Sequence, residues 1–140
     1  MSGHAGPCPE NCDCRPVYLA ARYSRRAELT GYAEELRSRG ITVRADWLKG
    51  EHDSLDGMVT DAGQAAWATI DRSDIDACGM FVAFTEEPRS GHSRGGRHVE
   101  LGMALARGKA VTVIGPRENV FCWLPEIGWF PSWSAFLEIL

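Results

Sequence analysis

The sequence contains no apolar run that approaches the roughly 20 residues needed to cross a bilayer, so we expect no membrane association. It also has no basic surplus, because 15 Lys and Arg face 19 Asp and Glu and the formal net charge is −4. Proteins that bind DNA or RNA normally carry such a surplus, so we expect no nucleic-acid partner. The first residues lack the charged segment and apolar stretch of a signal peptide, which predicts a cytoplasmic protein.

A disulfide framework is not expected either. The number of cysteines is odd, at five, and three of them crowd the first 15 residues. Cys78 and Cys122 stand in apolar segments and are predicted to be small buried residues. His4 and the three early cysteines could supply four zinc ligands, but all four lie in one short stretch. We favour the simpler interpretation that residues 1–15 form a flexible tail.

The remaining residues, 16–140, have the length of one domain. An apolar content of 44% with 24% charged residues excludes wholesale disorder. Short apolar runs, typical of buried parallel strands, alternate with segments in which apolar residues recur at intervals of three and four. This alternation predicts an α/β fold with a parallel sheet. The expected strands are 17–21, 41–45, 80–84 and 110–114, and the expected helices are 25–39, 61–77 and 97–107, with a short helix at the C-terminus.

The loop that follows the third expected strand is the most informative segment, because ligands of such sheets bind beyond the carboxyl ends of the strands. Residues 88–98 read PRSGHSRGGRH and hold three arginines, two histidines and no acid. Glycines before a helix expose backbone N–H groups, and the helix dipole adds positive charge. We favour a phosphate site over a solvated loop with incidental arginines. The loop is neither a Walker motif nor a dinucleotide fingerprint.

Carboxylates flank this loop on two helices. Glu100 is expected in the first turn of the following helix, where the dipole stabilises an ionised carboxylate. Two interpretations stay open: Glu100 only interacts favourably with the helix dipole, or it acts as a nucleophile. Asp71, Asp74 and Asp76 lie towards the end of the preceding helix, where the dipole disfavours acids, and one of them is a candidate proton donor. Two carboxylates that meet at one cleft suggest glycosyl chemistry.

Two of these segments resemble a known family. Trp-Ala-Thr at 67–69 with Asp71, and the run VELGMALARGK at 99–109, resemble the nucleoside 2-deoxyribosyltransferase family, which includes the deoxynucleoside 5'-monophosphate N-glycosidases. The resemblance covers roughly residues 17–124. It implies a flavodoxin-like three-layer sandwich with a five-stranded parallel sheet.

The resemblance also implies roles for individual residues. Glu100 matches the glutamate that forms a covalent glycosyl intermediate at C1', and Asp71 matches the aspartate that assists departure of the base. Tyr18, expected at the end of the first strand, matches an active-site tyrosine. Asn119 matches an asparagine that a neighbouring subunit inserts into the site, which implies a homodimer or larger homo-oligomer with shared active sites. No cofactor and no catalytic metal are implied.

The sequence departs from the transferases six residues before Glu100, where they carry an aspartate that holds the sugar 5'-hydroxyl. The nucleotide hydrolases place a serine there for a 5'-phosphate, whereas this chain has an arginine preceded by a serine. Because arginine pairs bidentately with phosphate, we expect a nucleoside 5'-monophosphate as substrate. His98 replaces a family glycine and either adds a donor or alters the choice of base. The expected phosphate ligands are Ser93, Arg94, Gly95, Gly96 and Arg97.

The expected reaction is cleavage of an N-glycosidic bond, with the sugar passing to water or to a second base. Three alternatives stay open: a transferase that acts on free nucleosides, an NAD-cleaving glycohydrolase and a non-catalytic nucleotide sensor. The presence of both Asp71 and Glu100 weighs against the sensor. Trp47 could stack on a base, although packing in the core or between subunits is favoured for it and for Trp123 and Trp129.

Overall fold

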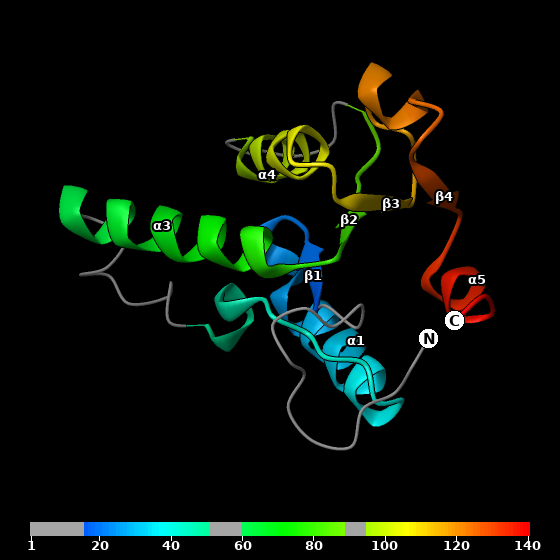
Figure 1. Ribbon diagram of the computed structural model, residues 1–140, viewed down its shortest axis with the longest axis horizontal. Helices are drawn as coiled ribbons and strands as arrows, with labels where there is room; N and C mark the ends of the chain where they lie inside the picture. Colours follow the sequence, from blue (N-terminus) through cyan, green and yellow to red (C-terminus); the bar gives the residue numbers. More distant parts are fainter. Residues whose placement is uncertain (1–15, 51–59, 89–94) are drawn as a thin grey trace.

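The computed structural model describes residues 16–50, 60–88 and 95–140, in which strands and helices alternate through most of the chain (Figure 1). The His4 and cysteine cluster of the tail therefore lies outside the described residues. The strands are β1 (Val17–Ala20), β2 (Met80–Phe84), β3 (Ala110–Ile114) and β4 (Gly128–Phe130). The α-helices are α1 (Arg26–Ser38), α3 (Asp61–Ala77), α4 (Gly96–Ala106) and α5 (Trp133–Leu137), and the 3-10 helices are η1 (Tyr23–Arg25), η2 (Asp46–Lys49) and η4 (Val120–Trp123).

The described residues form one parallel sheet of four strands in the order β1-β2-β3-β4, so the expected fifth strand is wrong. The strand predicted at 41–45 is reduced to an isolated parallel bridge between Val43 and Val17. Val17 donates to the Thr42 carbonyl at 2.8 Å and accepts from the Arg44 amide at 3.0 Å. The chain then turns into η2 at Asp46, so the pairing ends there.

β4 is the strand that the sequence did not indicate. It has three residues, Gly128, Trp129 and Phe130, and pairs with Thr112 to Ile114 of β3. A strand this short that begins with glycine leaves no alternating apolar pattern to recognise.

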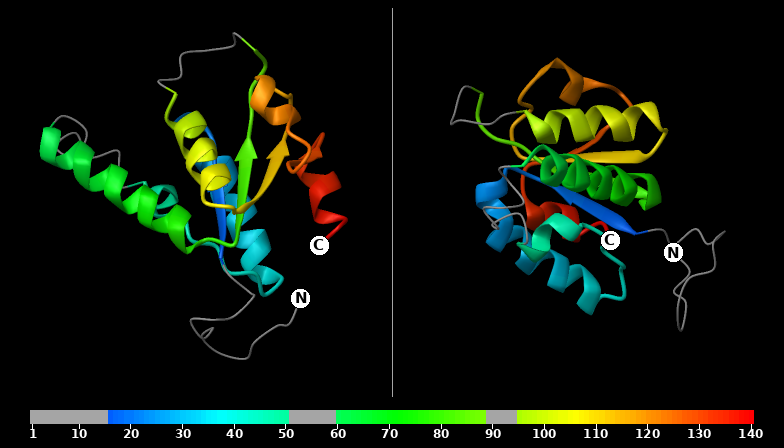
Figure 2. Two further views of the ribbon diagram at one scale, coloured as in Figure 1. Left: turned by 45° about the horizontal axis from the view of Figure 1, so that its top comes forward. Right: turned by 90° about the vertical axis from the view of Figure 1, so that its left-hand side faces the viewer.

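Helices cover both faces of the sheet, which confirms the three-layer α/β arrangement. Figure 2 shows α3 and α4 together on one face and α1 and α5 on the other. On the α1 and α5 face, Phe84 of β2 stacks on Tyr32, whose ring lies 4.5 Å from that of Trp133. A strand that helices cover on both faces has apolar side chains on both faces, which explains the continuous apolar runs in the sequence.

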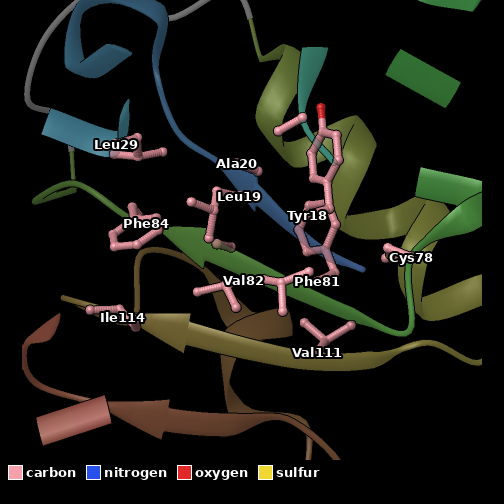
Figure 3. Close-up of a cluster of buried hydrophobic side chains, with 14 of the residues drawn as sticks. Tyr18, Leu19, Ala20, Leu29, Cys78, Phe81, Val82, Phe84, Val111 and Ile114 are labelled. Atoms are coloured by element: carbon pink, nitrogen blue, oxygen red, sulfur yellow. The ribbon is translucent and has the colours of Figure 1, made fainter. Parts of the chain in front are cut away.

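The α3 and α4 face carries the side chain that connects the core to the candidate site. Tyr18 of β1 stacks on its register partner Phe81, with ring centroids 5.3 Å apart, and Phe81 pairs in turn with Val111 (Figure 3). Cys78 and Cys122 are buried free thiols, as predicted. Burial of each large side chain of this cluster contributes about 1.5–3 kcal/mol relative to leaving it exposed.

The tryptophans divide between the core and the surface. Trp47 is buried and donates its indole N–H to the Leu19 carbonyl at 2.9 Å. This confirms core packing, and the buried ring is not accessible for stacking on a base. Trp123 and Trp129 are 65% and 37% exposed, so core packing is wrong for them. Their rings hold the Arg117 guanidinium at 4.1 and 4.4 Å.

α3 is packed unevenly along its length. Thr60 caps it by accepting from the Gly63 amide, and all residues of 61–70 are at least partly exposed. Asp74 and Ile75 near its end are fully buried. Figure 2 shows the N-terminal half of this helix extending beyond the sheet. In the described parts of the chain, no helix combines the length and apolar character that crossing a membrane requires.

Candidate active site

The N-terminus of α4 is built around two glycines. Gly95 caps the helix with φ +88°. Glycine adopts this left-handed conformation without strain, whereas residues with a side chain are strained in it. α4 begins at Gly96, so Glu100 is its fifth residue and lies beyond the first turn that the sequence predicted. The first backbone N–H groups of a helix have no partner within it, which is the arrangement that the predicted anion role of Gly96 requires.

Tyr18 reaches from the sheet to this helix. It is the second residue of β1, close to one end of that strand, and its hydroxyl donates a hydrogen bond to Glu100 Oε2. Figure 3 shows the hydroxyl at the end of a ring that points away from the strand. Burial, followed by the charges of Glu100 and Asp71, raises the pKa of Tyr18 well above its ordinary value. Tyr18 therefore stays a neutral phenol that donates to the carboxylate.

Glu100 does not have the low pKa that the helix-dipole argument predicted. Burial raises the pKa of Glu100 to about 7; the hydrogen bond from Tyr18 lowers it, and the charges of Asp71 and Asp74 raise it. The side chain stays partly exposed, so a ligand can reach it. A carboxyl with this pKa is about half ionised at neutral pH, which leaves a substantial population able to attack as a nucleophile.

Asp71 is the second candidate carboxyl, and its charge raises the pKa of both Tyr18 and Glu100. It lies well inside α3, which continues to Ala77. Burial, followed by the charges of Asp74 and Asp46, raises the pKa of Asp71 to about 7. Its Oδ1 is buried and has no hydrogen-bond partner among the described residues. A proton on Asp71 would remove the buried charge, and a hydrogen bond with a polar group of a ligand would satisfy that oxygen.

The other two candidate acids near the end of α3 bind other partners. Asp74 accepts from Arg44 Nε and from the Asp46 amide, both at 2.8 Å. Asp76 pairs with Arg107 at 2.8 Å. Asp71 and Glu100 are thus the two carboxyls that share the Tyr18 site. Two interacting carboxyls with raised pKa values tend to hold one proton between them, which supplies one acid and one nucleophile.

The remaining predicted ligands are arranged differently from expectation. Arg97 is 8% exposed and its guanidinium is bound to Glu118, so Arg97 does not face an incoming phosphate as predicted. Asn119 Nδ2 lies 3.4 Å from His98 Nδ1 of the same chain, and Asn119 Oδ1 accepts from the Phe121 amide. Ser93 and Arg94 lie outside the described residues. The sequence analysis missed Glu118, and its only signal was its place beside Asn119.

A hollow on the opposite face of the sheet contains none of these residues. It has a volume of about 410 Å³ and lies between α1, α5 and the ends of β2 and β3. Its lining includes Arg25 and Glu86, which bind each other at 2.9 Å, and the stacked rings of Tyr32, Phe84 and Trp133. The Arg25 and Glu86 charges of this hollow pair with each other, whereas Glu100 and Asp71, the carboxyls with raised pKa values, lie on the α3 and α4 face.

Comparisons with known proteins support the fold. The structure of the Clostridium botulinum CMP N-glycosidase BcmB is similar to this chain. The TM-score is 0.58 over 89% of this chain and 97% of that chain, with 19% sequence identity. At this identity the similarity shows the fold alone, and it supports the flavodoxin-like α/β arrangement. No protein-family model and no curated protein matches the sequence.

Substitution of Tyr18 with phenylalanine tests the hydrogen bond to Glu100. The bond lowers the pKa of Glu100, so its loss should raise that pKa further. Hydrogen bonds to charged groups contribute about 1.5–3 kcal/mol, which corresponds to about one pH unit or more. We expect the carbon-13 resonance of the Glu100 carboxyl to titrate about one unit higher in Tyr18→Phe. Tyr32→Phe, whose hydroxyl binds Glu28 on the other face, is the control. An unmoved midpoint would show that the bond does not stabilise the carboxylate.

Proposed function

We propose that this protein cleaves the N-glycosidic bond of a nucleoside 5'-monophosphate, with 2'-deoxyribose as the favoured sugar, through a covalent glycosyl-glutamate. The observation that carries the proposal is the pair of carboxyls, Glu100 and Asp71, both with a pKa near 7 and both acting on Tyr18. The fold shared with a CMP N-glycosidase supports it. The resemblance of residues 67–71 and 99–109 to the nucleoside 2-deoxyribosyltransferase family agrees with the same chemistry.

In the first step, the Glu100 carboxylate attacks C1' while the bond from C1' to the base nitrogen breaks through an oxocarbenium-like state. The proton of Asp71 passes to the departing base, which leaves neutral. Tyr18 donates to the other oxygen of Glu100 and holds the carboxylate in orientation. In the second step, water gives a proton to the Asp71 carboxylate and attacks C1', which releases Glu100 and the sugar phosphate. A second base in place of water gives transfer.

The phosphate is proposed to bind at the start of α4, on the backbone of Gly95 and Gly96 and on Ser93 and Arg94. The αL cap at Gly95 and the N-terminal N–H groups of α4 support this placement. Arg97 is not proposed as a direct ligand, because Glu118 occupies its guanidinium. His98, which is partly exposed in the first turn of the helix, is proposed to contact the sugar or the base.

A homodimer or larger homo-oligomer with shared sites is also proposed. Three exposed apolar side chains lie within four residues after Asn119. They are Val120, Phe121 and Trp123, which are 76%, 61% and 65% exposed. Neighbouring exposed apolar side chains of this size are typical of a surface that another protein covers. A second copy of the chain that packed here would lie beside Asn119 and His98, which supports a contribution to the site across the interface.

The test is a panel of ribo- and deoxynucleosides, their 5'-monophosphates and NAD, with release of free base followed by chromatography. We expect kcat/KM for a monophosphate to exceed that for its nucleoside by at least about 100-fold, because each charge-assisted hydrogen bond to phosphate contributes about 1.5–3 kcal/mol. A second free base in the reaction separates transfer, which yields a new nucleotide, from hydrolysis.

Three other results would each select an alternative. Release from free nucleosides alone would contradict the phosphate site and favour a transferase. Release of nicotinamide from NAD alone would favour a glycohydrolase. Binding of monophosphates with no base released from any compound would favour a sensor.

A further inference from the structure

The core-facing side of α4 contains an arginine. The buried residues of this helix are Arg97, Leu101 and Ala104, at intervals of four and three, which is the stripe that packs on the sheet. Such a position normally takes an apolar side chain. Because burying an ion pair carries a desolvation cost that its own attraction does not reliably offset, stability alone is a weak reason for an arginine there.

Glu118, in the loop after β3, neutralises this arginine. Arg97 Nη1 donates to Glu118 Oε1 and Arg97 Nη2 donates to Glu118 Oε2, both at 2.5 Å, and the two side chains are 7% and 13% exposed. Burial acts to raise the pKa of Glu118, but the hydrogen bonds from Arg97 and from the Glu86 amide outweigh it and the pKa is lowered. The pair is therefore charged, buried and bidentate, with one fixed geometry.

The Arg97–Glu118 pair joins four segments at the carboxyl edge of the sheet. Glu118 Oε1 also accepts from the Glu86 amide, 3.1 Å away in the loop after β2. The Glu86 carboxylate in turn binds Arg25 at 2.9 Å and lies 3.6 Å from Arg22, both from the segment after β1. Beside the pair, His98 of α4 and Asn119 of the loop after β3 lie within 3.4 Å of each other.

We propose that the Arg97–Glu118 pair positions the nucleophile: it fixes the first turn of α4 against the loop after β3, and thereby sets where the Glu100 carboxyl meets Tyr18 and the substrate. This inference rests on the function proposed above. Arg97 and Glu118 are positioning residues and touch neither the substrate nor the reacting atoms.

The geometry explains why a rigid tie is needed at this point. Glu100 follows Arg97 by three residues, which is about 4.5 Å along the helix axis. Attack on C1' requires the reacting atoms to approach within about 3–3.5 Å, and an error of about 1 Å costs on the order of 100-fold in rate. Gly96, the first residue of α4, has no side chain, so Arg97 is the first residue of the helix whose side chain can hold it against the rest of the protein.

The decisive variant replaces both charges with apolar side chains of similar length, Arg97→Met with Glu118→Met. Single replacement leaves one charge buried without its partner and should lower Tm, whereas the double replacement should recover most of that loss. We expect kcat of the double variant to stay at least about tenfold below the wild type while KM changes less than about threefold. The loss should be equal for a monophosphate and for its nucleoside.

A matched control exists at the other end of the same helix. Arg107 pairs with Asp76 of α3 at 2.8 Å, so Arg107→Met with Asp76→Asn removes an ion pair from α4 without touching its first turn. This variant should keep the wild-type kcat. If the apolar double variant does not fold, Arg97→Lys keeps the charge but loses the bidentate geometry, and the same fall in kcat is expected.

Two results would overturn the inference. Recovery of both Tm and kcat in the double variant would show that the pair is only structural. A loss confined to KM of the monophosphate, with the nucleoside unaffected, would show that Arg97 binds the phosphate directly.

A measurement without substrate separates this inference from the proposed function. The carbon-13 titration of the Glu100 carboxyl should move upward by about half a unit or more in the double variant, because a displaced carboxyl loses the hydrogen bond from Tyr18. The other groups that act on Glu100, Asp71 and Asp74, are unchanged, and the double variant removes one charge of each sign. An unmoved midpoint contradicts the positioning role even in an active enzyme. A moved midpoint in a protein that cleaves nothing supports the positioning role and refutes the proposed function.

Discussion

Replacement of Glu100 with glutamine is expected to lower the rate of base release by at least about 1,000-fold, because an amide cannot displace the base at C1' and form the glycosyl ester. The variant should still fold, since glutamine has nearly the same volume and its amide can bind the Tyr18 hydroxyl. Single-turnover kinetics with free base followed by chromatography measure the effect. In the wild type, rapid acid quenching followed by mass spectrometry should find the sugar attached to a peptide that contains Glu100.

The control for this prediction is Glu34→Gln, which makes the same chemical change on the exposed face of α1. It should leave the rate unchanged. Turnover by Glu100→Gln within tenfold of the wild type would contradict the nucleophile assignment, and a trapped sugar on another residue would reassign the role.

Replacement of Asp71 with asparagine is expected to lower the maximal rate by about 100-fold and to change the shape of the pH profile. Wild-type kcat/KM should pass through a maximum near pH 7. On the acid side, Glu100 takes up a proton and cannot attack; on the alkaline side, Asp71 loses the proton that it donates. Both have a pKa of about 7, and because the two carboxyls interact, the two apparent values belong to the pair.

The asparagine variant has no proton to lose at this position, so the alkaline limb should disappear. The charge of Asp71 raises the pKa of Glu100, so its removal should also shift the acid limb to lower pH. Asp61→Asn, at the exposed start of the same helix, is the control and should keep the bell shape. An alkaline limb that persists in Asp71→Asn would show that another group protonates the base.

Local sequence patterns predicted most of the framework because these patterns arise from the fold itself. The helix predicted at 61–77 is α3, and the helices predicted at 25–39 and 97–107 are followed by Gly40 and Gly108, whose φ of +79° and +69° end them. The patterns did not predict over how many residues each strand pairs with its neighbour. The segment at 41–45 has the composition of a strand but makes one bridge, and β4 pairs without such a composition.

The chemistry of the site could be predicted only in part, for a physical reason. Glu100, Asp71 and Tyr18 were candidates because of the resemblance to a known family; the structure joins Tyr18 to Glu100 by a hydrogen bond, and the charge of Asp71 acts on Tyr18. The pKa of Glu100 was predicted in the wrong direction because the dipole argument considers the helix alone, whereas burial by the sheet and α3 decides the value. The partner of Arg97 lies 21 residues away, and no spacing rule connects an arginine in a helix to a glutamate beyond the next strand.

The uneven packing of α3 has a consequence for its dynamics. From 61 to 70 every residue is at least partly exposed, so the backbone hydrogen bonds there are protected by little more than the helix itself. Asp74 and Ile75 are fully buried, and their turn opens only together with the core. We therefore expect local stability to increase along the helix, with Asp71 at the boundary between the exposed segment and the buried turn. Asp71, the proposed acid, is thus held to the core mainly through the residues that follow it in α3.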